Sequence, residues 1–220
     1  LPGAVVIVGH KGKIVFRKAY GNRSLVPTVE PMTIDTIFDV ASLTKPVATA
    51  TSIMILVEQG KLRLNDTVGM YIPDIDDANA KKITILQLLT HTSGYAPDFD
   101  LKEKWTGREG MLAALKKEKL RTPPGTKFVY SDIGFEILGE LVERITGTPI
   151  DLFVGPNLFG RLGAKDSGFR RRSGTNLTSP VPAAAEPTKL PGLARIAPTE
   201  NIRGQRSYLG SKFEGDDSIG

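Results

Sequence analysis

The amino-terminal pattern of the chain predicts two strands. Branched apolar residues fill positions 4–8 and 13–17, and the two runs are separated by Gly9-His-Lys-Gly12. Branched side chains favour extended backbone, and glycines at this spacing allow a tight turn. The segment is therefore expected to form an antiparallel hairpin that opens a sheet.

Apolar residues then recur at helical spacing. The stretch from Val47 to Val57 predicts a helix that begins near Ser42, accepts Pro46 in its first turn and ends at Gly60. The first helical turn would then place Ser42 at the electropositive end of the helix.

A second, more strongly periodic helix is predicted before Gly147, a residue type that commonly ends helices. Its apolar stripe comprises Ile133, Ile137, Leu138, Leu141, Val142 and Ile145. Ser131 or Asp132 is expected to cap its start. The other expected elements are helices at 85–89, 108–117 and 150–153, polar connections at 62–66 and 68–75, and a turn at 161–163.

These elements suggest two lobes with a cleft between them. Residues 1–62 are assigned to an α/β lobe that includes the Ser42 helix, and residues 63–160 to a mainly helical lobe. Residues 161–220 are interpreted as a loop-rich return toward the α/β lobe, because 170–198 is dense in Pro, Ser, Thr and Ala. The last twenty residues show little apolar periodicity and are expected to be weakly ordered.

Composition indicates an ordinary globular protein, with 40% hydrophobic and 24% charged residues. No apolar run approaches membrane-spanning length, and the absence of cysteine excludes disulfides and thiolate catalysis. The two histidines lie far apart, which argues against a zinc site. No metal or organic cofactor is expected.

The net charge of +5 comes from 29 basic and 24 acidic residues. Basic clusters at 116–119 and 170–172 could attract polyanions. No aromatic residues are interleaved with them, so we interpret both clusters as solvated faces and expect no nucleic-acid partner.

The candidate chemistry lies in two segments about 85 residues apart. Ser42-Leu-Thr-Lys45 sets a hydroxyl and an amine one helical turn apart, on the same face. Tyr130-Ser131-Asp132 presents a phenol, a hydroxyl and a carboxylate at a helix entrance. Taken singly, each motif can also be explained without catalysis. Ser42, Ser131 and Asp132 could be helix caps, Lys45 a solvated charge and Tyr130 a packed aromatic ring.

Together with His91-Thr-Ser-Gly94, these motifs resemble the serine β-lactamase and penicillin-binding protein superfamily, in its class C β-lactamase-related branch with DD-peptidases and family VIII carboxylesterases. Supporting phrases run from Pro2-Gly-Ala-Val to Ile196-Ala-Pro-Thr-Glu200. The resemblance implies a β-lactamase/transpeptidase-like α/β (α+β) fold, in which an antiparallel sheet lobe meets a helical lobe.

The resemblance also implies roles for the site residues. Ser42 would attack a carbonyl carbon and form an acyl-enzyme, with its backbone N–H as one oxyanion donor. Lys45 and Tyr130 would move protons, which requires a base whose pKa is shifted toward the working pH. Asp132 would contact the substrate.

Two departures from the family pattern affect the function. Asp132 stands where many members carry asparagine, and a carboxylate cannot donate to a substrate carbonyl as an amide can. The family's third motif, Lys-Thr-Gly or His-x-Gly, has no counterpart after Asp132, because Lys165, Lys189 and Lys212 are followed by other residues. The chain is also shorter than the family norm, so we expect a C-terminally truncated fragment with an incomplete sheet.

Three aromatic residues outside these two motifs are further candidates for structural or substrate-binding roles. His91 lacks a Gly-x-Ser-x-Gly partner motif and is expected to stabilise its loop by hydrogen bonds. Tyr95 and Trp105 are candidates for the acyl pocket, with ordinary packing as the equal alternative.

The sequence therefore predicts a serine acyl hydrolase acting on small-molecule esters, lactams or peptides. Carboxylesterase activity is favoured over β-lactamase and DD-peptidase activity. The alternative is a non-catalytic, penicillin-recognising or ligand-binding remnant of the same scaffold. The oligomeric state is left open, and an extracytoplasmic location is favoured over a cytoplasmic one.

Overall fold

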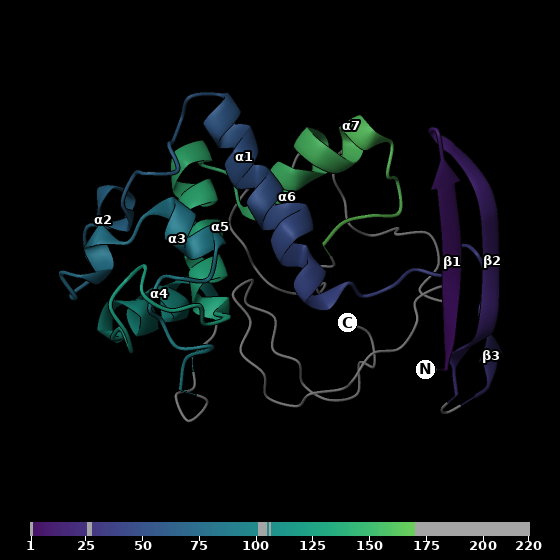
Figure 1. Cartoon of the computed structure of the whole chain (residues 1–220), viewed down its shortest axis with the longest axis horizontal. Coiled ribbons are helices and arrows are strands. Elements are labelled where there is room, and N and C mark those ends of the chain that lie inside the picture. The colour runs from purple at the N-terminus through teal and green to yellow at the C-terminus, as the bar shows by residue number, and fades with distance from the viewer. Residues whose placement is uncertain (1, 26–27, 101–104, 106, 170–220) are drawn as a thin grey trace. The chain divides into compact units, whose positions relative to one another are not determined.

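The computed structural model describes residues 2–25, 28–100, 105 and 107–169 of the chain (Figure 1). Its contacts divide into two compact units, one formed in the described part by the residues up to Val40 and the other by those from Ala41 onward. Each unit is described by itself. The predicted regions 1–62, 63–160 and 161–220 stay predictions.

The first unit is a three-stranded antiparallel sheet in the order β1-β2-β3, within the described residues. β1 spans Gly3–His10, β2 spans Lys13–Ser24 and β3 spans Glu30–Pro31. Lys11 and Gly12 connect the first two strands with φ angles of 47° and 74°. Two consecutive positive φ angles are typical of the type I′ turn, whose twist matches that of a hairpin. The predicted hairpin is confirmed, and both strands are longer than the apolar runs that indicated them.

The sheet exposes apolar side chains on both of its faces. Ile7 and Val8 are neighbours in β1 and point to opposite faces, yet both are exposed, as is Phe16 of β2. Neither face therefore carries a packed core over the described residues.

The helix after Ser42 is less regular than its apolar pattern predicted. A 3₁₀ turn at Ala41–Leu43 leads into a π-helical segment at Lys45–Ala50, and regular α1 spans Thr51–Glu58. The Thr51 hydroxyl donates to the Pro46 carbonyl at 3.1 Å. This contact spans five residues and satisfies a carbonyl outside the usual i−4 pattern. The predicted stop is confirmed, because Gly60 follows in a left-handed conformation.

The predicted polar connection at 68–75 is wrong in part. This segment contains the short helix α2, Val68–Tyr71, and buries Val68, Ile72 and Ile75 in the core. The pattern did not reveal this because four-residue helices are too short to show a periodicity. A 3₁₀ turn at Ala80–Lys82 follows.

Two further helices agree with their predicted bounds. α3 spans Ile85–Leu89 and begins with a capping box, in which Thr84 and Gln87 exchange side-chain and backbone hydrogen bonds. α4 spans Gly107–Lys117 and buries one face against the core.

The core of the second unit is built around α5, Asp132–Thr146 (Figure 1). Ser131 caps its start by accepting from the Gly134 N–H, and Gly147 ends it with φ 69°, as predicted. The predicted apolar stripe is buried from Ile133 to Val142, and α5 contacts α1, α2, α3 and α6.

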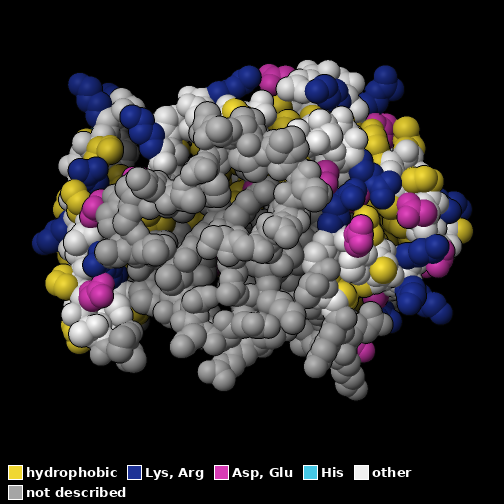
Figure 2. All heavy atoms as spheres, turned by 180° about the vertical axis from the view of Figure 1, so that it is seen from behind, with side chains coloured by type: hydrophobic (Ala, Val, Ile, Leu, Met, Phe, Trp, Pro, Cys, Tyr) yellow, Lys and Arg dark blue, Asp and Glu magenta, His cyan; other side chains and the backbone are white. Residues whose placement is uncertain are grey.

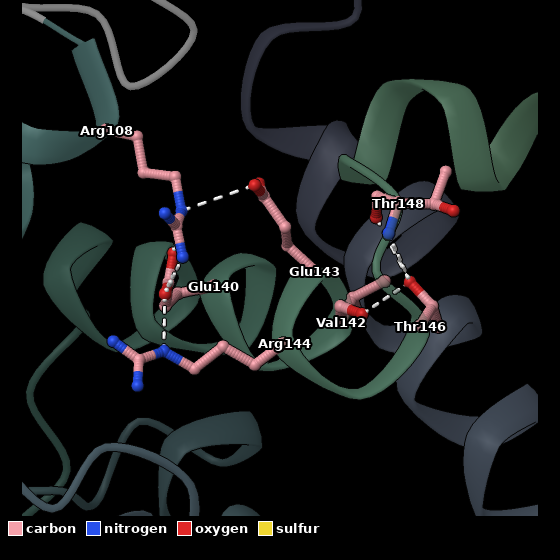
Figure 3. Close-up of polar contacts among 7 residues, drawn as sticks. All are labelled: Arg108, Glu140, Val142, Glu143, Arg144, Thr146 and Thr148. Carbon is pink, nitrogen blue, oxygen red and sulfur yellow. Dashed lines mark hydrogen bonds and ion pairs between the residues drawn. The ribbon is translucent and has the colours of Figure 1, made fainter. Parts of the chain in front are cut away.

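A buried ion-pair network joins α4 to the side of α5 (Figure 3). Glu140 is completely buried and accepts two hydrogen bonds from Arg108, at 2.7 and 2.6 Å, and one from Arg144 at 2.6 Å. Arg144 also donates to the Tyr71 carbonyl at 3.0 Å. Glu143 lies 3.3 Å from Arg108 at the edge of this network.

Three short helical segments follow α5. α6 spans Ile150–Val154, a π-helical turn covers Gly155–Phe159, and α7 spans Gly160–Leu162. The expected turn at 161–163 is the end of α7, with Gly163 in the left-handed conformation. The expectations for 170–198, for the cluster 170–172 and for the last twenty residues lie outside the described part.

Basic, acidic and apolar side chains are interspersed over the described surface (Figure 2). The predicted solvated cluster at 116–119 is largely exposed, and its acidic neighbours include Asp76, 4.0 Å from Lys116. Among the described helices, none combines the length and apolar character needed to cross a lipid bilayer.

Candidate active site

The structure brings the Ser42 hydroxyl and the Lys45 amine together. Lys45 Nζ donates to Ser42 Oγ at 3.3 Å, across the junction between the 3₁₀ turn and the π-helical segment. Ser42 is exposed, whereas only 14% of the Lys45 side chain is accessible. Ala41, just before the serine, has φ 43°, an uncommon conformation for a residue with a Cβ. A reachable hydroxyl is thus held over a largely buried cation.

Asp132 joins this pair from the first residue of α5. Its Oδ1 lies 2.6 Å from Lys45 Nζ, which makes a short charge-assisted contact between segments 87 positions apart. The two remote motifs therefore meet in one place, as the sequence predicted.

The pKa of Lys45 is raised above its ordinary value. Burial is the largest single effect and lowers the pKa, but hydrogen bonding and charge interactions with Asp132 and Tyr130 together outweigh it. Of the two groups expected to move protons, Lys45 therefore does not have a pKa shifted toward the working pH. Lys45 is an ammonium ion in this site, because a carboxylate stands where an amide would leave it without a counter-charge.

Tyr130 lies on the other side of the ammonium. Lys45 Nζ is 4.9 Å from the centre of the Tyr130 ring and 6.0 Å from that of Phe135. Aromatic faces attract cations at these distances. Tyr130 remains partly exposed, so its phenol is accessible beside the serine's lysine partner.

The Tyr130 segment is held by the polar turn that follows α3. The His91 carbonyl accepts from the Val129 N–H at 2.8 Å, and the Pro97 carbonyl accepts from the Asp132 N–H at 2.7 Å. Between them, Ser131 Oγ donates to the Ala96 carbonyl at 2.6 Å. These contacts explain why a turn with no catalytic group of its own belongs to the site.

Gly94 allows this turn to close. It has φ 90°, and a Cβ there would collide with the Thr122 carbonyl. Its own carbonyl accepts from the Arg121 N–H at 2.8 Å. Glycine is therefore required both for the left-handed backbone and for the close approach.

His91 has the structural contacts that the sequence predicted. Its Nδ1 accepts from the Ser131 N–H at 3.0 Å, and its ring lies 4.5 Å from the Tyr130 ring and 5.0 Å from the Phe135 ring. Burial and the nearby Lys45 charge lower the pKa of His91, against an opposing effect of Asp132.

The two candidate acyl-pocket residues lie elsewhere in the second unit. Tyr95 is in the core with 1% of its surface exposed, and Asp77 and Glu118 are the charges that act on its phenol. Trp105 packs against the core and meets Phe99 edge-on, with ring centres 5.5 Å apart. No described contact joins either residue to Ser42 or Lys45, and their predicted roles stay predictions.

Sequence reasoning missed Phe135 and the ion pair between Lys45 and Asp132. Phe135 follows Asp132 by three positions and therefore shares its helix face, a signal that was present in the periodicity. The ion pair depends on the approach of two distant segments, which spacing along the chain does not reveal.

Comparison with known proteins identifies the family. The beta-lactamase family model matches residues 1–194. The chain belongs to the beta-lactamase family. Its observed sheet and helices form part of the beta-lactamase/transpeptidase-like fold, which confirms the fold class expected from the resemblance.

The relatives within this family carry several names. An N-acetylmuramyl-L-alanine amidase of Bacillus subtilis is 35% identical over 183 residues, covering 74% of this chain and 42% of the relative. A putative D-alanyl-D-alanine carboxypeptidase of Salmonella agona is 32% identical over 187 residues, covering 76% of this chain and 43% of the relative. The chain thus spans less than half the length of these curated relatives.

A solved class C beta-lactamase matches along the whole chain. The TM-score is 0.71 at 26% identity, and the match covers 100% of this chain and 55% of that structure. The class C branch expected from the motifs is therefore supported by structure as well as by sequence.

Proposed function

We propose that this beta-lactamase family chain supplies the nucleophile of a serine acyl hydrolase, with Ser42 as the residue that is acylated. The observation that carries the proposal is the position of Lys45 Nζ, which is 3.3 Å from Ser42 Oγ and 2.6 Å from Asp132 while facing the Tyr130 ring. A free hydroxyl is a weak nucleophile, and a neighbouring cation makes it easier to deprotonate.

The charge on Lys45 determines how the proton moves. An ammonium donates to Ser42 Oγ and cannot accept the serine proton, so Tyr130 is the proposed acceptor. Attack forms a bond between Ser42 Oγ and the carbonyl carbon, and the serine proton is relayed through the Tyr130 phenol, whose oxygen accepts it as the phenol's own proton passes to the leaving group and the bond from that group to carbon breaks. Water then attacks the acyl carbon, one of its protons is relayed through the same phenol to Ser42 Oγ, and the ester bond between Ser42 and the acyl group breaks.

Small activated esters are the proposed substrates ahead of lactams and D-alanyl peptides. Ester leaving groups need less protonation than amines, and the Asp132 carboxylate stands where many family members carry an amide that can donate to a substrate carbonyl. In this proposal Asp132 holds Lys45 and contacts the substrate, while Tyr95 and Trp105 stay candidates for the acyl side. The relatives' names, an amidase and putative carboxypeptidases, favour amide substrates instead.

Acylation is tested by intact mass after exposure of the protein to a fluorophosphonate, with Ser42→Ala as the control. We expect one adduct on the wild type and none on the variant. Turnover of p-nitrophenyl acetate and of nitrocefin is then compared. Cleavage of nitrocefin alone would reverse the proposed substrate order, and an adduct that survives in Ser42→Ala would assign the nucleophile elsewhere.

The alternative is a binder that is acylated without turnover. This is the behaviour expected of a site with a single oxyanion donor, because loss of one donor reduces rates by about two to three powers of ten. A stable penicilloyl or phosphonyl adduct with no ester turnover would support this alternative. Absence of labelling in folded protein would reject both functions.

A further inference from the structure

Four hydrogen bonds attach the segment 129–132 to the turn at 91–97. Three of them end on backbone carbonyls, which accept at every pH. The fourth runs from the Ser131 N–H to His91 Nδ1 at 3.0 Å. It is the only one of the four whose acceptor can be protonated.

This bond requires a neutral imidazole with its proton on Nε2, because Nδ1 must offer a lone pair to the Ser131 N–H. Protonation would turn Nδ1 into a donor that faces another donor. The Ser131 amide lies between Tyr130 and Asp132 in the chain, so the two groups that contact Lys45 flank the bond on either side.

Packing couples the same ring to the site directly. The His91 ring lies 4.5 Å from the Tyr130 ring at 31° and 5.0 Å from the Phe135 ring at 34°. His91 itself has φ 56°, so the side chain is presented by a left-handed backbone that few residue types adopt.

We propose that His91 is an acid-sensitive positioning residue: its neutral ring fixes the Ser131 backbone, and with it Tyr130 and Asp132, against Lys45, and its protonation loosens that arrangement. The inference rests on the proposed function of Ser42. It assigns His91 no contact with the reacting atoms.

The charges that face the imidazole come from both neighbouring elements. Lys45, in the π-helical segment, opposes protonation, and Asp132, at the start of α5, favours it. Burial acts with Lys45, and the pKa of His91 is lowered. The His91 ring is therefore neutral at neutral pH. It becomes protonated, and its hydrogen bond from the Ser131 N–H is lost, only below the ordinary histidine pKa of 6.5.

The first test is the pH profile of Ser42 labelling by a fluorophosphonate. We expect the wild-type rate to fall on the acid side of pH 6.5, the ordinary histidine value. His91→Asn keeps an acceptor oxygen and suits a left-handed backbone. It should therefore retain most of the wild-type labelling rate at neutral pH and should not show the fall in rate at acid pH, here called the acid limb. His91→Ala should lower the rate about three- to tenfold at neutral pH, the effect of about one lost hydrogen bond, and should approach the wild-type rate at acid pH, where the wild type has lost the same bond.

The second test reads the contact without catalysis. The chain has only two histidines, so a His10→Gln variant leaves His91 as the single imidazole for nitrogen-detected NMR. We expect an unprotonated Nδ1 at neutral pH and a Ser131 amide resonance that shifts with the His91 titration. A protonated Nδ1, or a Ser131 amide that ignores the titration, would overturn the inference.

The two tests separate the inference from the proposed function. If no variant is labelled at any pH, the proposed function fails and NMR alone decides the contact. If labelling occurs but the acid limb persists in His91→Asn, the limb belongs to another group and the positioning role is rejected.

Discussion

At the scale of single residues, Lys45 decides the character of the site. Its ammonium contacts Ser42, Asp132 and the Tyr130 ring, so three polar partners share one cation. Burial alone would lower its pKa, and the net rise shows that its neighbours prevail. Asp132 is therefore one of two neighbours, with Tyr130, that raise the pKa of the group beneath the serine.

Asp132→Asn should lower the pKa of Lys45, because the amide removes the carboxylate's raising effects and leaves desolvation as the largest cause. If the Lys45 ammonium is the form that supports acylation, the rate of Ser42 labelling will decline as Lys45 loses its proton, and this decline will occur at a lower pH in the variant than in the wild type. Labelling rates measured across the alkaline range test this. Glu58→Gln, an equal charge change at an exposed position of α1, is the control. An alkaline limb that stays in place would contradict the assigned charge.

Tyr95→Phe should stabilise the protein by about 1 kcal/mol, since a buried hydroxyl without a partner is unfavourable. The Tyr95 phenol is buried, and none of the described residues accepts from it. Urea denaturation of both proteins gives the difference. A loss of stability in Tyr95→Phe would indicate that the phenol makes a hydrogen bond in the wild type. Slower Ser42 labelling in the variant would support the predicted acyl-pocket role of Tyr95.

At the scale of elements, α5 links the stability of the fold to the site. Its first residue, Asp132, contacts Lys45, and Glu140, two turns later, is clamped by Arg108 and Arg144 (Figure 3). A buried carboxylate with two guanidinium partners is expensive to disrupt, because removing one charge leaves the others unpaired.

Glu140→Gln should therefore reduce the free energy of unfolding by about 3 kcal/mol or more. Glu143→Gln is the matched control on the same helix, since its 3.3 Å contact with Arg108 joins two part-exposed side chains and predicts less than about 1 kcal/mol. Chemical denaturation of both variants measures the two losses. Equal losses would show that the buried network is no more important than its exposed edge.

Elements with a strong local signal could be predicted from the sequence. The Ile133 stripe, the stop at Gly147 and the turn before Lys13 all act within a few residues. The π-helical segment after Ser42 could not be predicted, because it depends on which hydroxyl and amide groups donate to the backbone carbonyls. Helix α2 was missed because its burial depends on segments that approach only in the folded unit.

The same distinction applies to the site. Motif order predicted that Ser42, Lys45 and Tyr130 meet, but the pKa of Lys45 also depends on a 2.6 Å contact with Asp132 that no spacing encodes. The contact between Arg108 and Glu140 joins residues 32 positions apart and was likewise invisible.

At the scale of the whole molecule, the shifted groups define a pH window of stability. On the acid side, the pKa of His91 is lowered, so the unfolded chain binds its proton first and stability falls as pH drops below 6.5. Asp66, which accepts from the Arg63 N–H and from the Tyr71 hydroxyl, also has a lowered pKa and adds a further loss below pH 3.8.

On the alkaline side three groups act in the same direction. Burial and the Asp66 contact raise the pKa of Tyr71 to about 12, burial raises that of Tyr95, and Lys45 is raised as described. Each loses its proton from the unfolded chain first, at about pH 10 to 10.5, so the folded state loses stability as pH rises further.

The free energy of unfolding should therefore be flat from about pH 6.5 to pH 10 and fall on both sides, as measured by urea denaturation at a series of pH values. In Tyr71→Phe the alkaline fall should be shallower between pH 10 and 12, because the group that ionises late in the folded state is gone. A Tyr71→Phe curve parallel to the wild type in that interval would mean that Tyr71 ionises equally in both states, which is incompatible with its 2.8 Å bond to Asp66.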